Sequence, residues 1–195
     1  MKIAKSKHKN IFCIEGDWTN DMRDTASIKT GLEFLEHNSY SKKKVSHIHT
    51  RCSTLDEFES RLRESILKKY EQFGIMYFAF HGNEGKLQIG KRLTITLDEI
   101  ADILENKAQN KIIHFGSCET LAVGKVQINR FIKKTGALAV SGYSKTIDFI
   151  PSTFLDLLYF QFCQRYQKMY LIENEMKAYY SKFISQLGFK MVYEK

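Results

Sequence analysis

With 195 residues, the chain is long enough for one domain with a substantial core and too short for two comfortable ones. Its hydrophobic content of 43% and aromatic content of 13% exclude a disordered chain. The net charge of +8 is scattered, with dense runs only at Lys2 to Lys9 and at Lys42 to Lys44. Because no basic-aromatic stripe accompanies it, nucleic-acid binding is not expected. We predict a single domain over residues 1–195.

The four cysteines form no Cys-x-x-Cys pair and no regular framework, which favours a reducing compartment. Three of them occupy apolar or strand-like contexts in which a buried free thiol is usual: Cys13, Cys52 and Cys163. The apolar stretch at Ile11 is broken by Glu15 and Asp17, so it is too short for a signal peptide. No run reaches membrane-spanning length. We therefore expect a cytoplasmic protein with no membrane partner.

The first elements form a strand, a helix and a second strand. Ile11 to Ile14 is apolar and predicts a strand whose carboxyl end carries Glu15 and Asp17. A helix is expected over about 27–37, and the alternating stretch 45–52 predicts a half-exposed edge strand. His47 and His49 lie on that strand, but no third ligand stands at a sensible spacing, so we interpret them as surface histidines and predict no metal site.

The middle of the chain contains two capping boxes, each followed by a helix that leads into an apolar strand. Residues 54–57 and 96–99 both read Thr-Leu-Asp-Glu, in which the Thr hydroxyl and Glu carboxylate satisfy first-turn amides. The first helix precedes a strand over 75–80 that ends at His81-Gly82. Residues 87–95 alternate around Gly90-Lys91 and predict a small β-hairpin. The second helix precedes a strand over 111–117 that presents Cys118.

The last third of the chain continues the β/α alternation. A helix over about 127–135 leads to an apolar strand over 137–140, which leaves through Ser141, Gly142 and Tyr143. Pro151 predicts the start of a helix reaching about residue 166, whose expected core-facing positions include Phe154. A final helix is expected over about 171–187, and residues 189–193 could add a last strand. The core is expected over about 11–166.

The apolar runs before His81 and Cys118 are typical of parallel strands buried on both faces of an α/β sheet. Chemistry in such sheets lies at the carboxyl ends of the strands, so these two side chains are expected to face each other as base and thiol nucleophile. Gly82 has no side chain, and its amide could form an oxyanion hole with the amide of Cys118. His114 is the competing base, but it lies inside its strand and is interpreted as a hydrogen-bonded core histidine.

The ordered combination of these features resembles the caspase-like (clan CD) cysteine peptidases, most closely the bacterial branches that include CHAT-type domains. The matching features are the strand before His81-Gly82, the Gly85-x-Leu87 hairpin, the helix, and the strand before Cys118. The resemblance extends over about 11–162. It implies an α/β three-layer sandwich with a mostly parallel, caspase-hemoglobinase-like sheet and a small β-hairpin inserted after the catalytic His strand.

The resemblance also implies roles for individual residues. Cys118 would form an acyl-enzyme during peptide-bond hydrolysis, His81 would act as general base and acid, and Gly82 would supply an oxyanion amide. The segment after the fifth strand pairs with substrate backbone in the family, which maps to Ser141, Gly142 and Tyr143. The family's specificity pocket is built partly at the end of the first strand, which maps to Glu15 and Asp17.

The sequence departs from caspases proper in ways that affect specificity. Those enzymes carry an Ala-Cys-x-Gly block and arginines that bind substrate aspartate, whereas this chain has Gly116-Ser117-Cys118-Glu119-Thr120. It offers acids at the end of the first strand, so we expect a preference for Lys or Arg before the scissile bond. The His-Cys separation is 118 − 81 = 37 residues, against roughly 50 for caspases, so the intervening hairpin and helix are compact.

Two function classes follow from the sequence. The favoured one is a cysteine peptidase that needs no cofactor, acts on a protein or peptide substrate, and is controlled by a partner, a ligand or processing. By resemblance, this role fits a bacterial stress or antiphage effector. The alternative is a caspase-like fold that serves as a non-catalytic interaction module. The reactivity of Cys118 distinguishes the two classes.

Overall fold

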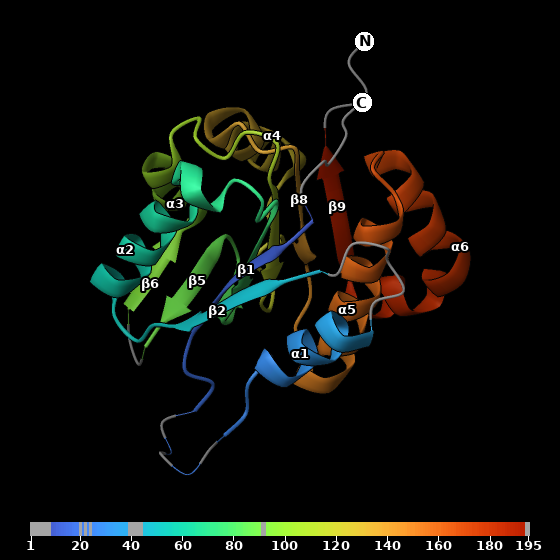
Figure 1. Cartoon of the computed structure of the whole chain (residues 1–195), viewed down its shortest axis with the longest axis horizontal. Helices are drawn as coiled ribbons and strands as arrows, with labels where there is room; N and C mark the ends of the chain where they lie inside the picture. Colours follow the sequence, from blue (N-terminus) through green and yellow to red (C-terminus); the bar gives the residue numbers. More distant parts are fainter. Residues whose placement is uncertain are drawn as a thin grey trace.

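The structure, a computed structural model, describes residues 9–19, 21, 23, 25–38, 45–90 and 93–193. Its centre is a six-stranded sheet in the order β2-β1-β3-β7-β8-β9 (Figure 1). The first five strands are parallel and β9 is antiparallel to β8. The strands are β1 (Ile11–Glu15), β2 (His47–Arg51), β3 (Ile75–Ala79), β7 (Ile112–Gly116), β8 (Ala139–Tyr143) and β9 (Phe189–Tyr193).

The inner strands form because their residues are apolar on both faces. Every residue of β1, β3, β7 and β8 is buried. Successive side chains point to opposite faces of a sheet, so Phe12 and Ile14 join one hydrophobic core, whereas Ile11 and Cys13 join the other. These uninterrupted apolar runs are typical of parallel strands covered by helices on both sides. The edge strand β2 is only partly buried, as predicted.

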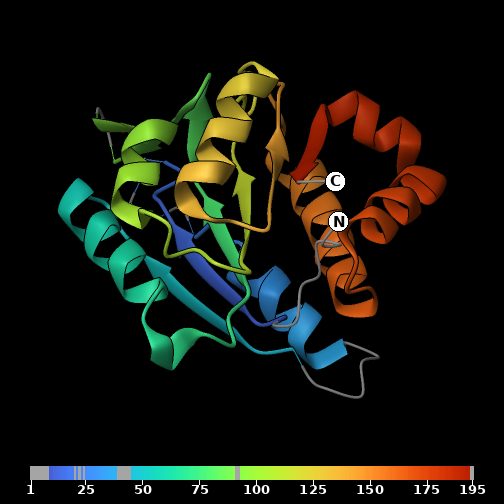
Figure 2. The ribbon, with the colours of Figure 1, turned by 90° about the horizontal axis from the view of Figure 1, so that it is seen from above.

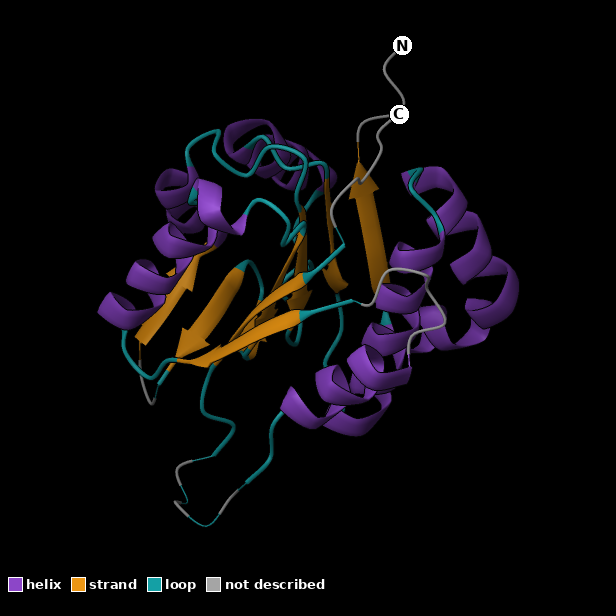
Figure 3. Ribbon diagram, viewed as in Figure 1, coloured by secondary structure: helices purple, strands orange, loops and turns teal. Residues whose placement is uncertain are grey.

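Helices cover both faces of the sheet and make a three-layer α/β structure (Figures 2 and 3). One face carries α2 (Leu55–Ser65), α3 (Leu97–Leu104) and α4 (Lys125–Thr135), whose apolar side chains belong to the core that contains Phe12. The other face carries α1 (Lys29–Asn38), α5 (Phe149–Arg165) and α6 (Met169–Leu187). A short 3-10 helix, η1 (Lys68–Tyr70), follows α2. The predicted α/β class is therefore confirmed.

The two predicted capping boxes differ in detail. At α3, the Thr96 hydroxyl accepts a hydrogen bond from the Glu99 amide, and the Glu99 carboxylate accepts one from the Thr96 amide. At α2, the Thr54 hydroxyl accepts from the Glu57 amide, but the Glu57 carboxylate accepts from the amide of Ser53 instead. Both helices thus begin where the Thr-x-x-Glu pattern predicts.

A second, antiparallel sheet follows β3 directly. The predicted hairpin corresponds to β5 (Lys86–Ile89) and β6 (Leu93–Thr96). The sheet has a third strand that the pattern did not predict, β4 (His81–Asn83), which begins at the candidate base itself. Lys91, part of the predicted turn, lies outside the described residues. The backbone of His81 and Gly82 is therefore held between the end of β3 and the pairing of β4 with β5.

Two expectations for the last third of the chain need correction. The fifth strand is β8 at 139–143, shifted toward the carboxyl end, so it includes Ser141, Gly142 and Tyr143. Phe154 is 60% exposed rather than core-facing, because α5 packs through Leu155, Tyr159 and Phe160. The helix is apolar on several sides, and its periodicity alone did not identify the buried one. The last strand is confirmed, and β9 pairs along the whole of β8.

Candidate active site

The strands β3 and β7 are neighbours, and they place His81 and Cys118 at the same edge of the sheet. Ala79 pairs with Gly116 at the carboxyl ends of the two strands. His81 stands two residues beyond Ala79, and Cys118 stands two residues beyond Gly116. The prediction that both residues leave neighbouring parallel strands at one edge is therefore confirmed. This is the edge at which open α/β sheets carry their ligand and catalytic sites.

The ring of His81 is held by Trp18, which follows β1. Its Nε2 atom lies 2.6 Å from the Trp18 carbonyl oxygen, and the two rings meet edge-on with centroids 5.4 Å apart. A carbonyl oxygen can only accept, so Nε2 must carry a proton. In the neutral ring, Nδ1 is then the basic nitrogen, and it has no hydrogen-bond partner among the described residues. The Trp18 contact thus selects the tautomer in which Nδ1 can accept a proton.

The thiol of Cys118 is partly buried and contacts the backbone of Ile147, in the loop after β8. The Ile147 amide donates to Sγ over 3.4 Å, and Sγ lies 3.5 Å from the Ile147 carbonyl oxygen. No hydrogen bond joins His81 to Cys118 within the ranges that the structure describes. A proton transfer between them would require a hydrogen bond that this arrangement lacks. The structure therefore shows the two groups at one edge and the thiol in a resting contact.

Gly82 lies against the segment that carries the cysteine. A Cβ atom at this position would be 2.5 Å from Thr120 Oγ1, 2.6 Å from the Cys118 carbonyl oxygen and 2.9 Å from Ser117 Cβ. Real Cβ contacts are not this short, so only glycine fits beside the Cys118 backbone. The two residues predicted to supply oxyanion amides are thus brought together.

A tight turn follows Cys118 and is tied to the loop that contacts the thiol. Glu119 has a left-handed backbone with φ of 54°, and its amide donates to the carbonyl oxygen of Lys145. Its carboxylate accepts a hydrogen bond from the Thr146 hydroxyl. A left-handed backbone is uncommon for a residue with a side chain, and such strain is frequent at functional sites. The helix α4 begins only at Lys125.

Glu15 is not placed where a substrate can reach it. Its side chain is fully buried and accepts hydrogen bonds from Trp18 Nε1, Ser27 Oγ and the Ile28 amide, and it pairs with His49 Nε2 at 2.6 Å. Burial by itself raises the pKa of the carboxyl, but the hydrogen bonds, led by that of His49, outweigh it and hold the pKa below the ordinary value. Glu15 is therefore an internal anchor between β1, β2 and the start of α1.

Asp17 is exposed and already has polar partners. Its carboxylate accepts a hydrogen bond from Ser53 Oγ over 2.6 Å and lies 3.3 Å from an Arg51 guanidinium nitrogen. Both partners lie at and just beyond the end of β2. Of the two acids predicted for a specificity pocket, only Asp17 is open to solvent.

Ser141, Gly142 and Tyr143 are internal residues of β8. The strand pairs with β7 on one side and with β9 on the other. Ser141 Oγ lies 2.9 Å from His114 Nδ1, and the Tyr143 hydroxyl donates to Asp156 and to the Ser152 carbonyl oxygen. The structure therefore does not bring these three residues to the site as a free strand edge, because β9 occupies the position that a substrate strand would need.

The competing histidine, His114, belongs to a buried hydrogen-bond network. Its Nε2 lies 2.8 Å from Asp156 Oδ1, and the same carboxylate accepts from the hydroxyls of Tyr77 and Tyr143. Burial raises the pKa of both tyrosines, so their hydroxyls remain donors. His114 is fully buried, as is its partner Ser141. The interpretation of His114 as a hydrogen-bonded core residue is confirmed.

No group of three or more possible metal ligands occurs among the described residues. His49, predicted to be a surface histidine, is instead largely buried because it pairs with Glu15, and its side chain is only 10% exposed. In the same described part of the chain, none of the helices is both long and apolar enough to span a bilayer.

Three residues of this region were not predicted as site or network residues: Trp18, Ile147 and Asp156. Trp18 carries a signal, since the sole tryptophan of the chain stands three residues beyond the end of β1, at the same sheet edge. Asp156 also carries one, because it is the sole carboxylate of an apolar helix, and a carboxylate that such a helix buries needs hydrogen-bond partners. Ile147 has no such signal, since it acts through its backbone and its position depends on the fold of a loop.

Comparison with known families assigns the chain to one of them. The chain belongs to DUF6642, a family of unknown function whose profile matches residues 8–193. The match includes both strands that carry the candidate pair and also β9. No curated protein matches the sequence.

Proposed function

We propose that the protein is a cysteine peptidase of caspase-like type, with Cys118 as nucleophile and His81 as general base and acid. The observation that carries the proposal is the paired register of β3 and β7, which sets His81 and Cys118 equally far beyond neighbouring strand ends. A histidine and a cysteine in this order on adjacent buried strands are also the features by which the sequence resembles the caspase-like peptidases.

The tautomer of His81 supports the role of a base. With Nε2 donating to the Trp18 carbonyl oxygen, Nδ1 is left to accept the thiol proton. The thiolate then attacks the scissile carbonyl carbon, forming a C–S bond, while the developing oxyanion is met by the amides of Gly82 and Cys118. The C–N bond breaks as the leaving amine takes the proton from His81. Water, deprotonated by His81, hydrolyses the thioester and restores the thiol.

Only one of the two acids predicted for the specificity pocket is open to a substrate. A preference for Lys or Arg rests on Asp17 alone, since Glu15 is fully buried and bonded internally. Asp17 would share its carboxylate between a substrate cation and its present partners, Arg51 and Ser53. A peptide library cleaved by the wild-type protein, with Cys118→Ala as the blank, measures this preference directly. Cleavage confined to sites after Asp would contradict it.

A non-catalytic interaction module is the second candidate, and one observation favours it. The Cys118 thiol contacts Ile147 rather than His81. If the protein is an interaction module, the thiol stays in contact with Ile147, and the edge of the sheet has a structural role only. In the peptidase interpretation, the thiol leaves this contact without substrate and ionises beside His81, which an alkylating reagent detects.

Alkylation of Cys118 by iodoacetamide distinguishes the two functions. For a peptidase, we expect Cys118 in the wild-type protein to react at least about tenfold faster than a free-cysteine peptide near pH 6.5, because a thiolate is the reacting species. His81→Ala should lower the rate by about tenfold or more, and Cys118→Ala should abolish the fast reaction. Intact-mass spectrometry follows the modification over time.

The matched control is the exposed histidine His37 on α1, whose replacement by alanine should leave the rate unchanged. Circular dichroism of each variant establishes that it is folded. A rate for Cys118 equal to that of the free-cysteine peptide, and unaffected by His81→Ala, would exclude the peptidase and favour the interaction module.

A further inference from the structure

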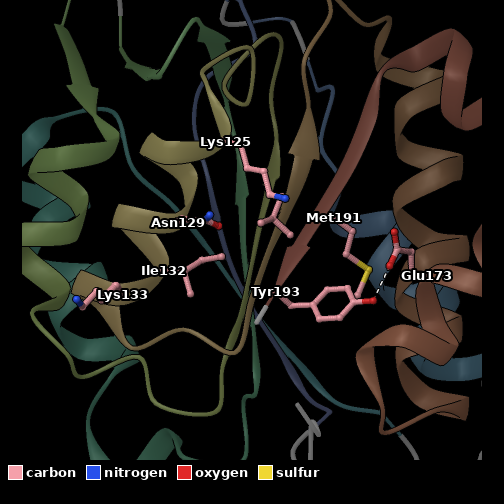
Figure 4. Close-up of a pocket in the computed structure, with 8 residues that line it drawn as sticks. Lys125, Asn129, Ile132, Lys133, Glu173, Met191 and Tyr193 are labelled. Atoms are coloured by element: carbon pink, nitrogen blue, oxygen red, sulfur yellow. Dashed lines mark hydrogen bonds between the residues drawn. The ribbon is translucent and has the colours of Figure 1, made fainter. Parts of the chain in front are cut away.

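A groove of about 700 Å³ lies beside β9, between α4 and α6 (Figure 4). Its α4 wall includes Lys125, Asn129 and Ile132, and its floor includes Met191 and Tyr193 of β9. The volume is within the range of protein ligand sites. The groove is separate from the candidate active site, because Tyr193 pairs with Ala139 at the start of β8, whereas Cys118 lies beyond the carboxyl end of β7.

The strand β9 has an open edge at this groove. It is the last strand in the sheet order, and within the described residues it pairs with β8 alone. Every second residue of such a strand directs its amide and carbonyl outward, ready to pair with another strand. Proteins commonly protect such edges with lysine or proline. β9 has no proline, and the ammonium of Lys190 donates instead to the Leu121 carbonyl oxygen.

The two walls of the groove differ in chemistry. In Figure 4, Lys125, Asn129 and Ile132 lie on the α4 side of β9, whereas Met191 and Tyr193 extend toward α6. A smaller hollow on the α6 side is lined partly by Met176, Ile184, Phe189 and Met191. The acid on that side, Glu173, accepts from the Tyr193 hydroxyl and pairs with Lys177, so its charge is balanced locally. Lys125 thus gives one wall a positive charge, and the other wall is mainly apolar.

We propose that this groove binds an extended peptide segment of another protein by adding it as a strand to β9. Side chains of an added strand alternate between the two faces with a period of two. Acidic residues at every second position would face Lys125, whose ammonium is directed toward β9 in Figure 4, and the apolar residues between them would face Met191 and the smaller hollow. The recognised segment is therefore one in which acidic and apolar residues alternate.

A second copy of the chain is a poorer occupant of the groove. A two-fold contact places the same surface on both partners, so the interface would enclose Lys125 of both copies, while the one acid among the described residues that line the groove, Glu173, is already paired with Lys177. Like charges across an interface oppose association. An acidic segment from a different protein instead brings the complementary charge.

Fluorescence anisotropy with two labelled peptides tests the proposal. One probe alternates glutamate and valine over seven residues, and the other has the same composition with its glutamates and valines in separate blocks. The protein is the full chain carrying Cys118→Ala, so neither probe is cleaved and the result does not depend on the proposed peptidase. We expect the alternating probe to bind at least about tenfold more tightly than the block probe.

Charge reversal at Lys125 identifies the groove as the binding site. Lys125→Glu should weaken binding of the alternating probe by about tenfold or more and should improve binding of a lysine-valine version. Lys182→Glu makes the same charge change on an exposed position of α6 that does not line the groove, and it should leave binding unchanged. Both variants replace exposed side chains, so their folds should be retained.

Three results would overturn the proposal. The first is equal affinity for the alternating and block probes. The second is equal weakening by Lys125→Glu and Lys182→Glu, which would show attraction by overall charge alone. The third is dimerisation, measured by sedimentation, that competes with the probe and is strengthened by Lys125→Glu, which would make a second copy the occupant.

Discussion

Burial gives different roles to the two carboxylates at the end of β1. Glu15 and Asp17 are separated by a single residue at the end of β1, yet one is fully buried and the other is exposed. Glu15 accepts hydrogen bonds from two side chains and a backbone amide and pairs with His49, so its negative charge is compensated inside the protein. An uncompensated buried charge would be far more costly. Glu15 thus connects β1 to residues distant in sequence.

The low pKa of Glu15 makes a prediction for stability against pH. Because its folded pKa lies below its ordinary value of 4.5, its contribution to stability is present above that value and is lost as the pH falls through the folded pKa. Glu15→Gln removes the charge and leaves a single acceptor oxygen for the donors. We expect the unfolding free energy to fall by about 2–3 kcal/mol at pH 7. Urea unfolding of wild type and Glu15→Gln at several pH values measures this difference in unfolding free energy.

The difference between wild type and Glu15→Gln should narrow below about pH 4.5 as the wild-type carboxyl becomes protonated. Glu84→Gln changes an exposed carboxyl and serves as the control, with an expected effect within about 0.5 kcal/mol. A deficit for Glu15→Gln that stayed constant down to pH 3 would contradict the role of the ionised form.

Single residues could be predicted from the sequence where their neighbours along the chain define their environment. His81 and Cys118 end apolar runs, and His114 lies inside one, so position along the chain distinguished the two strand-end residues from the buried histidine. Glu15 and Ser141 were misjudged because their partners, His49 and His114, stand 34 and 27 residues away in sequence. The local sequence pattern does not show which distant residue will form a hydrogen bond with a given polar side chain.

At the scale of elements, the register of β3 and β7 and the small sheet after β3 together build the candidate site. The register aligns the two strand ends, and β4 turns the chain so that Gly82 packs against the backbone of Cys118. The hairpin was predictable from its alternation, but β4 was not. A strand of three residues that includes a glycine has too little pattern to be recognised.

Gly82 and Gly124 form a matched pair for testing this packing. Gly82→Ala would put a methyl group 2.6 Å from a backbone carbonyl oxygen, whereas at Gly124 no atom lies within 4 Å of the added group. We expect Gly82→Ala to lower the unfolding free energy by about 1–3 kcal/mol. Gly124→Ala should stay within about 0.5 kcal/mol of wild type. Urea unfolding of both variants measures the difference, and equal effects would contradict the close contact at Gly82.

At the scale of the whole molecule, two hydrophobic cores enclose three of the four thiols. Cys13 and Cys163 belong to the core under α1, α5 and α6, and Cys52 belongs to the opposite core. Burial raises the pKa of Cys13 well above its ordinary value and raises the pKa of Cys52 and Cys163 to about 12. Cys118 alone is partly exposed.

The number of reactive thiols therefore depends on the fold. With Ellman's reagent near pH 8, we expect one thiol to react rapidly in the native protein and four to react in guanidinium chloride, because buried thiols react only when the structure opens. Cys118→Ala should leave no rapidly reacting thiol in the native protein. A second fast thiol in the native wild-type protein would contradict the burial of Cys13, Cys52 or Cys163.

The sequence by itself determined the α/β class, the alternation of strands and helices, and the positions of His81 and Cys118 at the ends of two apolar runs. These features follow from local rules, since strand and helix periodicity, capping boxes and turn residues all act over a few positions. Only the tertiary structure decided that Glu15 is internal, that β9 closes the edge of β8, and that Ile147 contacts the thiol. Each of these depends on contacts between segments far apart in the chain, which local pattern cannot specify.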